Sequence, residues 1–346
     1  MALVYRRTDL VLRRGAPAAE ALVKALQLDL RKLGYLRSGI DGQFGDGTER
    51  AVRALQFDLL HGSSAGDDGA APVALRTFNR GRVTDLTGIV DERLAGCLED
   101  LLGDPGVTAL PRSDDPVAAN QQAFASVRRM VGLTAPRSFL LAILLQESGG
   151  LHFRVPTPGN PDDYIVVGLD RNDEDHPDHI TSRGYGIGQY TLFHHPPRAD
   201  EVQTLMLDPV GNVRRAVREL TDKLDNFVNG PTPGAQADDR LAEIGRGALR
   251  RCRFEASDPR FMNDCVRCAA GSLIDITPET PLHPGTTDTL QPTQYHPETG
   301  YSRVPDRAKM GCDWPYAVRR YNGSGVNSYH YQFEVLQRLT RPPVAG

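Results

Sequence analysis

Apolar residues near the N-terminus recur at helical spacing in three segments, which predicts three short helices. The first segment carries Leu22, Val23, Leu26, Leu30 and Leu33 on one face within residues 20–35. Thr48 is placed to cap a second helix over residues 48–60, and a third helix follows a turn within residues 85–102. A tight loop rich in glycine and aspartate, IDGQFGDGT, separates the first two helices. We therefore predict a small three-helix domain over residues 1–103.

The next segment, DPGVTALPRSDDP at residues 104–116, is rich in proline and aspartate and lacks helical spacing, so we predict an interdomain linker. Helical patterns resume at residues 117–133, 136–148, 208–229 and 314–339. The stretch from about 230 to 312 is irregular, with few apolar runs. The predicted fold class is therefore mainly α. A small three-helix domain precedes an α-rich domain at 117–346 that carries a large irregular insertion at about 230–312.

Composition is ordinary for a soluble globular protein, and it narrows the choice of partners. Apolar residues make up 40% of the 346 residues and charged residues 24%. A net charge of -4 gives no reason to expect nucleic acid as a partner, and no apolar run reaches the length of a membrane-spanning helix. The apolar stretches at the N-terminus are too short for the core of a signal peptide. We expect synthesis in the cytoplasm, with neither nucleic acid nor membrane as a partner.

Glu147 stands at the end of one of the most hydrophobic segments, in the sequence ILLQESGG. A carboxylic acid at the edge of apolar surroundings is disfavoured in its charged form, so its pKa should rise toward the range where it donates a proton near neutral pH. A glycoside-cleaving enzyme requires this property of its acid. Taken alone the signal is weak, because a glutamate at a helix end is more often a solvated surface residue.

Three later segments strengthen the signal. SRGYGIGQYT is a glycine-punctuated turn that contains Gln189, whose amide can hydrogen-bond a sugar or its acetamido group. LDPVGNVRRAVRELTDKL begins a long amphipathic helix with a proline in its first turn. AVRRYNGSG brings Tyr321 and Asn322 to a helix end that opens into a Gly-Ser loop.

The N-terminal segments resemble the peptidoglycan-binding domain attached to many cell-wall hydrolases. The resemblance rests on LVKALQLDLRKLGYL, IDGQFGDGTERAVRALQ and TGIVDERLAGCL, and it covers about residues 18–103. It implies a wall-binding domain whose characteristic turn contains Asp41, Gly42, Phe44 and Gly45. The Gly/Ala/Ser-rich excursion at about 61–82 is longer than the usual link to the third helix.

The later segments are similar, in order and spacing, to the lysozyme-like lytic transglycosylases and the goose-type lysozymes. The resemblance covers about residues 135–229 and 313–340. It implies Glu147 as the catalytic acid, Ser148 as a support for that acid or the substrate, Gln189 and Tyr321 as substrate or transition-state contacts, and Asn322 as the residue that orders the loop of Tyr321.

The chain departs from these families at two places. Gly188 stands where the transglycosylases commonly have methionine before the glutamine, which removes a side chain from the floor of the cleft. The insertion of about 80 residues before YNGSG is also unusual. It could form a lid, a second substrate wall or a docking surface.

Whether the glycosidic bond is hydrolysed or rearranged stays open at this point. Hydrolysis with inversion needs a second carboxylate to activate water, whereas the transglycosylases resemble one-carboxylate enzymes. Goose-type lysozymes place accessory aspartates in the interval between Glu147 and Gln189, so Asp170 or Asp173 is a possible second carboxylate, and a solvated acidic loop is the alternative for each.

No metal and no cofactor is predicted. The acidic cluster DRNDED lacks the glycine and the distal glutamate of a calcium loop. The neighbouring histidines, His176, His179, His194 and His195, fit no zinc spacing.

Four of the five cysteines, Cys252, Cys265, Cys268 and Cys312, fall within or at the edge of the irregular insertion. Their clustering predicts a local staple. Disulfides are favoured, because a loop-rich insertion with little core gains most from crosslinks in an oxidising compartment. A four-thiolate zinc site and reduced thiols are the alternatives, and the pairing is not fixed by the spacing. The remaining cysteine, Cys97, lies in a helical pattern and is expected to be a buried small apolar residue.

Together these inferences predict a peptidoglycan-degrading glycosidase that cuts the MurNAc-β-1,4-GlcNAc bond with Glu147 as general acid/base, either a lytic transglycosylase or a muramidase. Delivery to the wall would resemble that of a phage endolysin or of an antibacterial effector carried by an injection machine. A cognate immunity protein or a secretion component is then a possible partner besides peptidoglycan. The alternatives are a non-catalytic wall-binding component of a phage or secretion machine, and a chitinase-like hydrolase.

Overall fold

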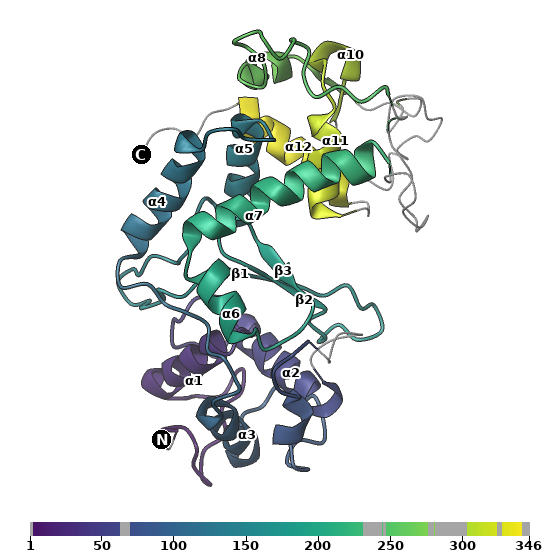
Figure 1. The fold of residues 1–346 in the computed structure, drawn as a ribbon. Coiled ribbons are helices and arrows are strands. Elements are labelled where there is room, and N and C mark those ends of the chain that lie inside the picture. The colour runs from purple at the N-terminus through teal and green to yellow at the C-terminus, as the bar shows by residue number, and fades with distance from the viewer. Residues whose placement is uncertain are drawn as a thin grey trace. The chain divides into compact units, whose positions relative to one another are not determined.

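The computed structural model describes residues 3–62, 70–230, 244, 247–275, 280, 303–323 and 327–340. Contacts within the chain define two compact units, one of Met1–Ala123 with Leu151–Asn212 and the other of Phe124–Gly150 with Val213–Gly346. The fold is mainly α, which confirms the predicted class (Figure 1). The excursion predicted at 61–82 and the insertion predicted at 230–312 lie partly outside the described residues.

The helices predicted near the N-terminus form a packed group in the first unit. They are α1 (Glu20–Lys32), α2 (Asp46–His61) and α3 (Glu92–Gly103), with the short 3-10 helix η1 (Leu75–Phe78) between the last two. Their apolar faces meet in one core that contains the fully buried Leu26, Leu30, Val52, Leu55, Cys97 and Leu98. Helical spacing of the apolar positions predicts this result, because such spacing gathers them on one face of each helix.

Two buried glutamines fix the turns of this helical group. The Nε2 of Gln27 on α1 donates to Oδ1 of Asp41 (2.9 Å), and its Oε1 accepts from the N–H of Gly42 (2.8 Å). Gln56 on α2 repeats the second contact, because its Oε1 accepts from the N–H of Gly88 (2.8 Å). The buried amide of Gln27 needs hydrogen-bond partners, which explains why the sequence motif places Asp41 and Gly42 after that glutamine.

A three-stranded antiparallel sheet belongs to the same unit. Its strands are β1 (Val167–Asp170), β2 (Ser182–Tyr185) and β3 (Tyr190–Leu192), in the order β1-β2-β3 with Val167 opposite Tyr185 and Tyr185 opposite Tyr190. The short helix α6 (Ala199–Glu201) and the π-helical segment η2 (Val202–Met206) follow. The sequence indicates only a loop-rich section here, since strands of three or four residues are too short to show clear alternation.

Two buried ion pairs join the helices to the segment that contains the sheet. Arg31 on α1 pairs with Asp162 at 2.7 Å, and the two side chains are 0% and 1% exposed. Asp58 on α2 pairs with Arg183 on β2 at 3.3 Å and also accepts a hydrogen bond from the Tyr35 hydroxyl at 2.7 Å. A buried charged side chain is stable only beside a group that compensates its charge. These pairs therefore hold the helices and the sheet segment together.

The division into units does not fall at the predicted linker. The chain passes between the units inside α4 (Pro116–Arg129), after Gly150 and inside α7 (Pro209–Asp222). Residues 104–116 lie wholly within the first unit. Separate domains over residues 1–103 and 117–346 stay a prediction.

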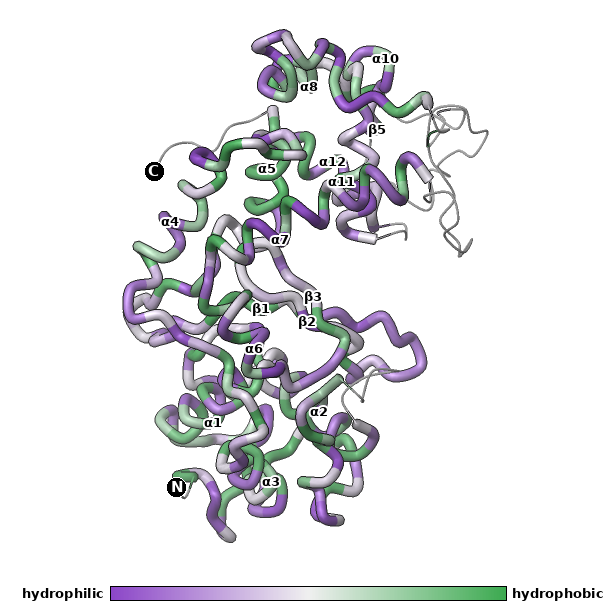
Figure 2. Tube along the Cα trace, in the orientation of Figure 1, coloured by the Kyte–Doolittle hydropathy of each residue, from purple (hydrophilic) through white to green (hydrophobic). Residues whose placement is uncertain are grey.

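The second unit is built on α5 (Arg137–Ser148), α11 (Trp314–Asn322) and α12 (Asn327–Thr340), and α12 packs against the other two. Its core contains the buried residues Phe139, Ile143, Trp314, Val335 and Leu336. The hydrophobic colour runs along α5 in Figure 2, as expected for a helix whose body is core. The π-helical segment η3 (Lys223–Val228) continues α7 and packs against α11.

The described part of the insertion packs onto this second core. It contains α8 (Cys265–Ala269), α10 (Arg307–Met310) and the two-stranded antiparallel sheet of β4 (Leu273–Asp275) and β5 (Arg303–Pro305). The indole Nε1 of the buried Trp314 donates to the carbonyl of Arg251 at 2.8 Å, which attaches the insertion to α11. No helix among the described residues is both long and apolar enough to cross a membrane.

The first prediction concerns the buried pair of Arg31 and Asp162. Burial lowers the pKa of Arg31 to about 10, with the positive charge of Arg154 acting in the same direction and Asp162 opposing both. Replacing Asp162 with Asn leaves a buried cation without its counter-charge, so we expect the free energy of unfolding to fall by about 3 kcal/mol. Urea unfolding of the full chain, followed by far-ultraviolet circular dichroism, measures the change.

The adjacent residue supplies the control. Asp163 pairs with Arg112, whose side chain is 56% exposed, and the Asp163→Asn variant should lose less than about 1 kcal/mol. Equal losses in Asp162→Asn and Asp163→Asn would contradict the role given to the buried pair.

Candidate functional site

Glu147 lies on the last turn of α5, which ends at Ser148 as the helical pattern over residues 136–148 predicts. Gly149 adopts a left-handed conformation with φ of 67°, and its N–H donates to the carbonyl of Leu145 at 3.0 Å. The N–H of Gly150 donates to the carbonyl of Leu144 at 3.1 Å. This pattern satisfies the last carbonyls of the helix, and it leaves Glu147 half-buried at the edge of the apolar body.

A buried tyrosine of α12 contacts the Glu147 carboxylate. The Tyr331 hydroxyl donates to Oε1 of Glu147 at 2.5 Å, a distance typical of a charge-assisted O–H···O bond. Burial raises the pKa of Tyr331 well above its ordinary value, and the negative charge of Glu147 acts in the same direction. Tyr331 therefore stays protonated and keeps its donor role. Sequence reasoning missed this residue, because the contact joins positions far apart in the chain.

Tyr321, a predicted substrate contact, also lies near Glu147. Burial raises its pKa, followed by the negative charges of Glu147 and Glu219, while the positive charge of Arg215 opposes them. The structure thus brings Tyr321 together with Glu147, and it adds Glu219 of α7, which the sequence did not single out. Asn322, predicted to order the Tyr321 loop, is exposed at the end of α11.

The hydroxyl of Ser148 donates to the carbonyl of Leu144 at 3.1 Å, within its own helix. Serine commonly makes this bond one turn back along a helix. The predicted support of Glu147 or the substrate by Ser148 stays a prediction.

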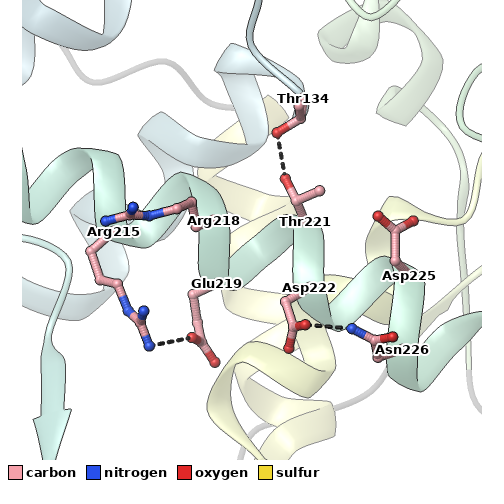
Figure 3. Close-up of a pocket in the computed structure, with 8 residues that line it drawn as sticks. All are labelled: Thr134, Arg215, Arg218, Glu219, Thr221, Asp222, Asp225 and Asn226. Atoms are coloured by element: carbon pink, nitrogen blue, oxygen red, sulfur yellow. Dashed lines mark hydrogen bonds and ion pairs between the residues drawn. The ribbon is translucent and has the colours of Figure 1, made fainter. Parts of the chain in front are cut away.

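A pocket of about 600 Å³ opens along α7 and η3 in the second unit (Figure 3). It is lined by Thr134, Arg215, Arg218, Glu219, Thr221, Asp222, Asp225 and Asn226. Glu219 pairs with Lys223 at 2.9 Å and with Arg215 at 3.7 Å. Glu219 lines this pocket, and its negative charge also raises the pKa of Tyr321. The pocket and the phenol near Glu147 therefore share one carboxylate.

Gln189 belongs to the first unit and lies on the predicted glycine turn between β2 and β3. Its φ of 49° is left-handed, which is uncommon for a residue other than glycine. Its Nε2 donates to the carbonyl of Gly186 at 2.7 Å. A Cβ on Gly168 or Gly184 would lie 2.3 or 2.7 Å from its Oε1, so only glycine at those strand positions admits the folded-back amide. The Gln189 amide thus hydrogen-bonds the backbone of its own turn. Its contact with a sugar stays a prediction.

Two buried side chains that sequence reasoning missed hold this turn in place. Asn212, from the DPVGN segment, accepts from the N–H of Gly188 at 2.8 Å and donates to the carbonyl of Tyr185 at 2.9 Å. His152 accepts from the N–H of Ile187 at 3.2 Å through Nδ1 and bonds the Met206 carbonyl through Nε2 at 2.7 Å. A side chain of the DPVGN segment therefore hydrogen-bonds the backbone of the GIGQ turn, a contact that the order of the segments in the sequence does not reveal.

The two candidate second carboxylates are both engaged within the first unit. Asp170, at the end of β1, accepts from the Ser182 hydroxyl at 2.7 Å. Asp173 contacts Nδ1 of His179 at 2.9 Å, and this bond, with a further one from His176, lowers the pKa of Asp173. Glu147 belongs to the other unit. A water-positioning role for either aspartate stays a prediction.

The turn predicted for the wall-binding domain is built into the helical group of the first unit. Asp41 and Gly42 bond Gln27, and Phe44 is buried in the core. Gly42 has a φ of 78°, and a Cβ there would lie 2.3 Å from the Cγ of Glu20. Gly45 is the N-cap residue of α2. These residues shape the turn.

The four clustered cysteines surround one small cavity and are free thiols, as is Cys97, so the expected disulfides are not formed in the structure. The cavity is lined by Cys252, Cys265, Cys268 and Cys312 together with Arg251, Arg253, Phe254, Arg260, Asp264 and Met310. A disulfide demands specific Cα separations and convergent Cβ directions, which sharing a cavity does not guarantee. Among the described residues no group of His, Cys, Asp or Glu side chains is arranged to hold a metal ion.

Comparison with known proteins identifies part of the first unit. Residues 19–59 match the family model of a peptidoglycan binding domain. This confirms the N-terminal resemblance over α1, the DGxFG turn and most of α2. The chain matches no curated protein and no solved structure, so the lysozyme-like resemblance of the later segments stays a prediction.

The second prediction follows from His152. Burial lowers its pKa to about 4, although the bond to the Met206 carbonyl and the charge of Asp208 oppose the shift. An unfolded histidine titrates near 6.5, so the unfolded chain takes up protons first as the pH falls. The contribution of neutral His152 to the free energy of unfolding is therefore fully present above about pH 6.5. It decreases as the pH falls toward 4, by on the order of 3 kcal/mol at most.

Urea midpoints at pH 7 and pH 5 measure this loss. His152→Gln should show a smaller difference between the two midpoints than the parent. A residual slope is expected, because burial also lowers the pKa of His195 well below its ordinary value. An unchanged slope in His152→Gln would contradict the assignment.

The third prediction concerns the buried thiols. Burial raises the pKa of Cys265 to about 12, and it also raises that of Cys312. At pH 8 only about one Cys265 in ten thousand is then a thiolate, the reactive form. Iodoacetamide should label these two cysteines at least about 100-fold more slowly in the native protein than in denaturant, as measured by mass spectrometry of peptides. Fewer than five titratable thiols in denaturant without reductant would show that disulfides form after all.

Proposed function

We propose that the protein binds peptidoglycan through the first unit and cleaves its glycan strands with Glu147 as general acid/base. The wall-binding half is supported by the match of residues 19–59 to a peptidoglycan binding domain. The catalytic half is carried by one observation, the half-buried Glu147 with the protonated hydroxyl of Tyr331 at 2.5 Å from Oε1.

The environment of Glu147 suits a group that must present a proton in a defined direction. Tyr331 is buried in the core cluster that also contains α5 residues, so the bond to Oε1 orients the carboxyl group. The bond stabilises the ionised carboxylate by about 1.5–3 kcal/mol, so it favours the base form that remains once the proton has left. The glycines after Ser148 keep the end of α5 free of bulky side chains. The fixed direction of the carboxyl group and the open helix end both support a general acid/base role at a leaving-group oxygen.

Wall binding and cleavage in one chain have a physical advantage. Peptidoglycan is an insoluble polymer, and a tethered enzyme meets its bonds at a high effective concentration. The MurNAc-β-1,4-GlcNAc bond is the proposed target. Action at the wall agrees with the peptidoglycan binding match. We further propose that the protein reaches the wall as an endolysin or as an injected effector. Its partner would then be an immunity protein or a secretion component.

Glu219 is the carboxylate that we assign as the partner of Glu147 if the reaction is hydrolytic. It acts on the same phenol, Tyr321, and it pairs with Lys223 at 2.9 Å. Asp170 and Asp173 were the alternatives indicated by the sequence. In a transglycosylase the substrate supplies its own nucleophile, and no such partner is needed.

The fourth prediction tests the acid. Glu147→Gln keeps an acceptor for Tyr331 but cannot donate the proton, so clearing of purified peptidoglycan should fall by at least about 100-fold. Tyr331→Phe should lose about tenfold, because the carboxyl group loses its orienting bond. Turbidity loss of a sacculus suspension measures both rates, and thermal midpoints establish that the variants are folded.

Tyr329→Phe on the same helix is the matched control, since its ring lies under Arg319 at 4.4 Å and phenylalanine keeps that contact. It should stay within about twofold of the parent. Full clearing by Glu147→Gln would leave a non-catalytic wall-binding protein as the better interpretation, and clearing of chitin but not of peptidoglycan would favour a chitinase-like enzyme. Mass spectrometry of the released fragments distinguishes anhydro ends, left by a transglycosylase, from reducing ends, left by a muramidase.

A further inference from the structure

A second pocket, of about 480 Å³, lies in the first unit and is separate from the residues discussed above as catalytic. It is lined by Tyr35, Arg37, Ser38, Gly47, Arg50, Ala51, Leu169 and Arg171. Six of these eight fall within the matched segment 19–59, and the other two come from β1 and the residue that follows it. The peptidoglycan binding segment and the sheet therefore build this pocket together.

Three guanidinium groups line this pocket and no carboxylate does. None of Arg37, Arg50 and Arg171 forms an ion pair within the described part of the chain. Arg171 is held in place by donating to the carbonyls of Pro177 (3.2 Å) and Asp178 (2.9 Å). The lining of this pocket therefore carries three positive charges and no negative one.

Three carboxylates in this part of the unit are already engaged by other arginines. Asp178 pairs with Arg53 at 2.6 Å, and Asp46, in the first turn of α2, pairs with Arg14 at 2.6 Å. Asp58 is held in the buried pair with β2. These three carboxylates therefore form their ion pairs with arginines outside the lining of the pocket.

The positive charges affect one another. Burial lowers the pKa of Arg171; the nearby Asp178 opposes this shift, and the charges of Arg183 and Arg50 add to it. An anion in the pocket would offset this repulsion. Guanidinium groups bind carboxylates and phosphates through two parallel hydrogen bonds, and of these two anions peptidoglycan itself supplies carboxylates.

We propose that this three-arginine pocket binds the carboxylates of the peptide stems of peptidoglycan. The stems carry the polymer's amino-acid carboxylates, whereas the amino-sugar backbone presents mainly hydroxyl and acetamido groups. Gly47 keeps the pocket open, because a Cβ there would lie 2.4 Å from the Ser38 hydroxyl. The inference deepens the wall-binding half of the proposed function and rests on it, and it assigns the pocket a preference for glycan strands that still bear stems.

The fifth prediction tests this pocket by co-sedimentation with insoluble peptidoglycan. The full chain carries Glu147→Gln throughout, so that the polymer is not cut during the assay. Arg37→Gln with Arg50→Gln should weaken binding to intact sacculi about tenfold, and Arg171→Gln alone should weaken it severalfold. Arg76→Gln, on the exposed side of η1 in the same unit, removes an equal charge outside the pocket and should stay within about twofold.

The ligand is tested with sacculi whose free carboxylates have been converted to amides by a carbodiimide and ammonia, which leaves the glycan and the stems in place. The parent should bind this amidated material about as weakly as the double variant binds intact sacculi. Equal binding of the parent to intact and amidated material would overturn the stem-carboxylate assignment, and unchanged binding by the double variant would overturn the pocket. If the double variant has a lowered thermal midpoint, Arg37→Gln alone, at an exposed position, decides the question. Because the readout is binding, loss of the catalytic proposal would leave this result intact.

Discussion

A charged group can leave water in this protein only beside a group that compensates it. Arg31 with Asp162, and Asp58 with Arg183 and Tyr35, meet this condition at almost zero exposure. These contacts hold the helical group and the sheet segment of the first unit together. The same rule governs the second unit, where the carboxylate of Glu147 is partly withdrawn from water and Tyr331 donates to it. Arg37 and Arg50 of the three-arginine pocket stay exposed to water and need no such partner, so they can bind the proposed ligand carboxylate.

Neutral hydrogen bonds give the glycine turn its shape. His152 and Asn212 reach it from different segments and bond its backbone. Gln189 is folded over Gly168 and Gly184, where any Cβ would collide with its amide. The two glycines thus leave room for the Gln189 amide in this folded-back position. A substrate role for Gln189 would need its amide to exchange a bond within the turn for one to a sugar.

Binding and cleavage rest on different kinds of support in this chain. Wall binding is indicated by the family match over residues 19–59 and by a pocket suited to carboxylates. The proposed cleavage rests on the chemistry around one carboxylate, near which the fold places a fixed phenol, a second phenol and the carboxylate of Glu219. The cysteines contribute apolar volume, since the buried Cys265, Cys268 and Cys312 belong to the core cluster of the second unit.

Helical spacing and glycine stops were enough to predict the mainly α class, the three N-terminal helices, and the ends of α5 and α11. These features depend on residues close together in the chain, so local patterns determine them. Glu147 and Tyr321 could also be singled out from their own segments. Tyr331, Glu219, His152 and the three arginines could not, because each gains its meaning from contacts between distant segments. The short strands and the buried ion pairs escaped prediction for the same reason, since burial and pairing of charge are decided only when the chain has folded.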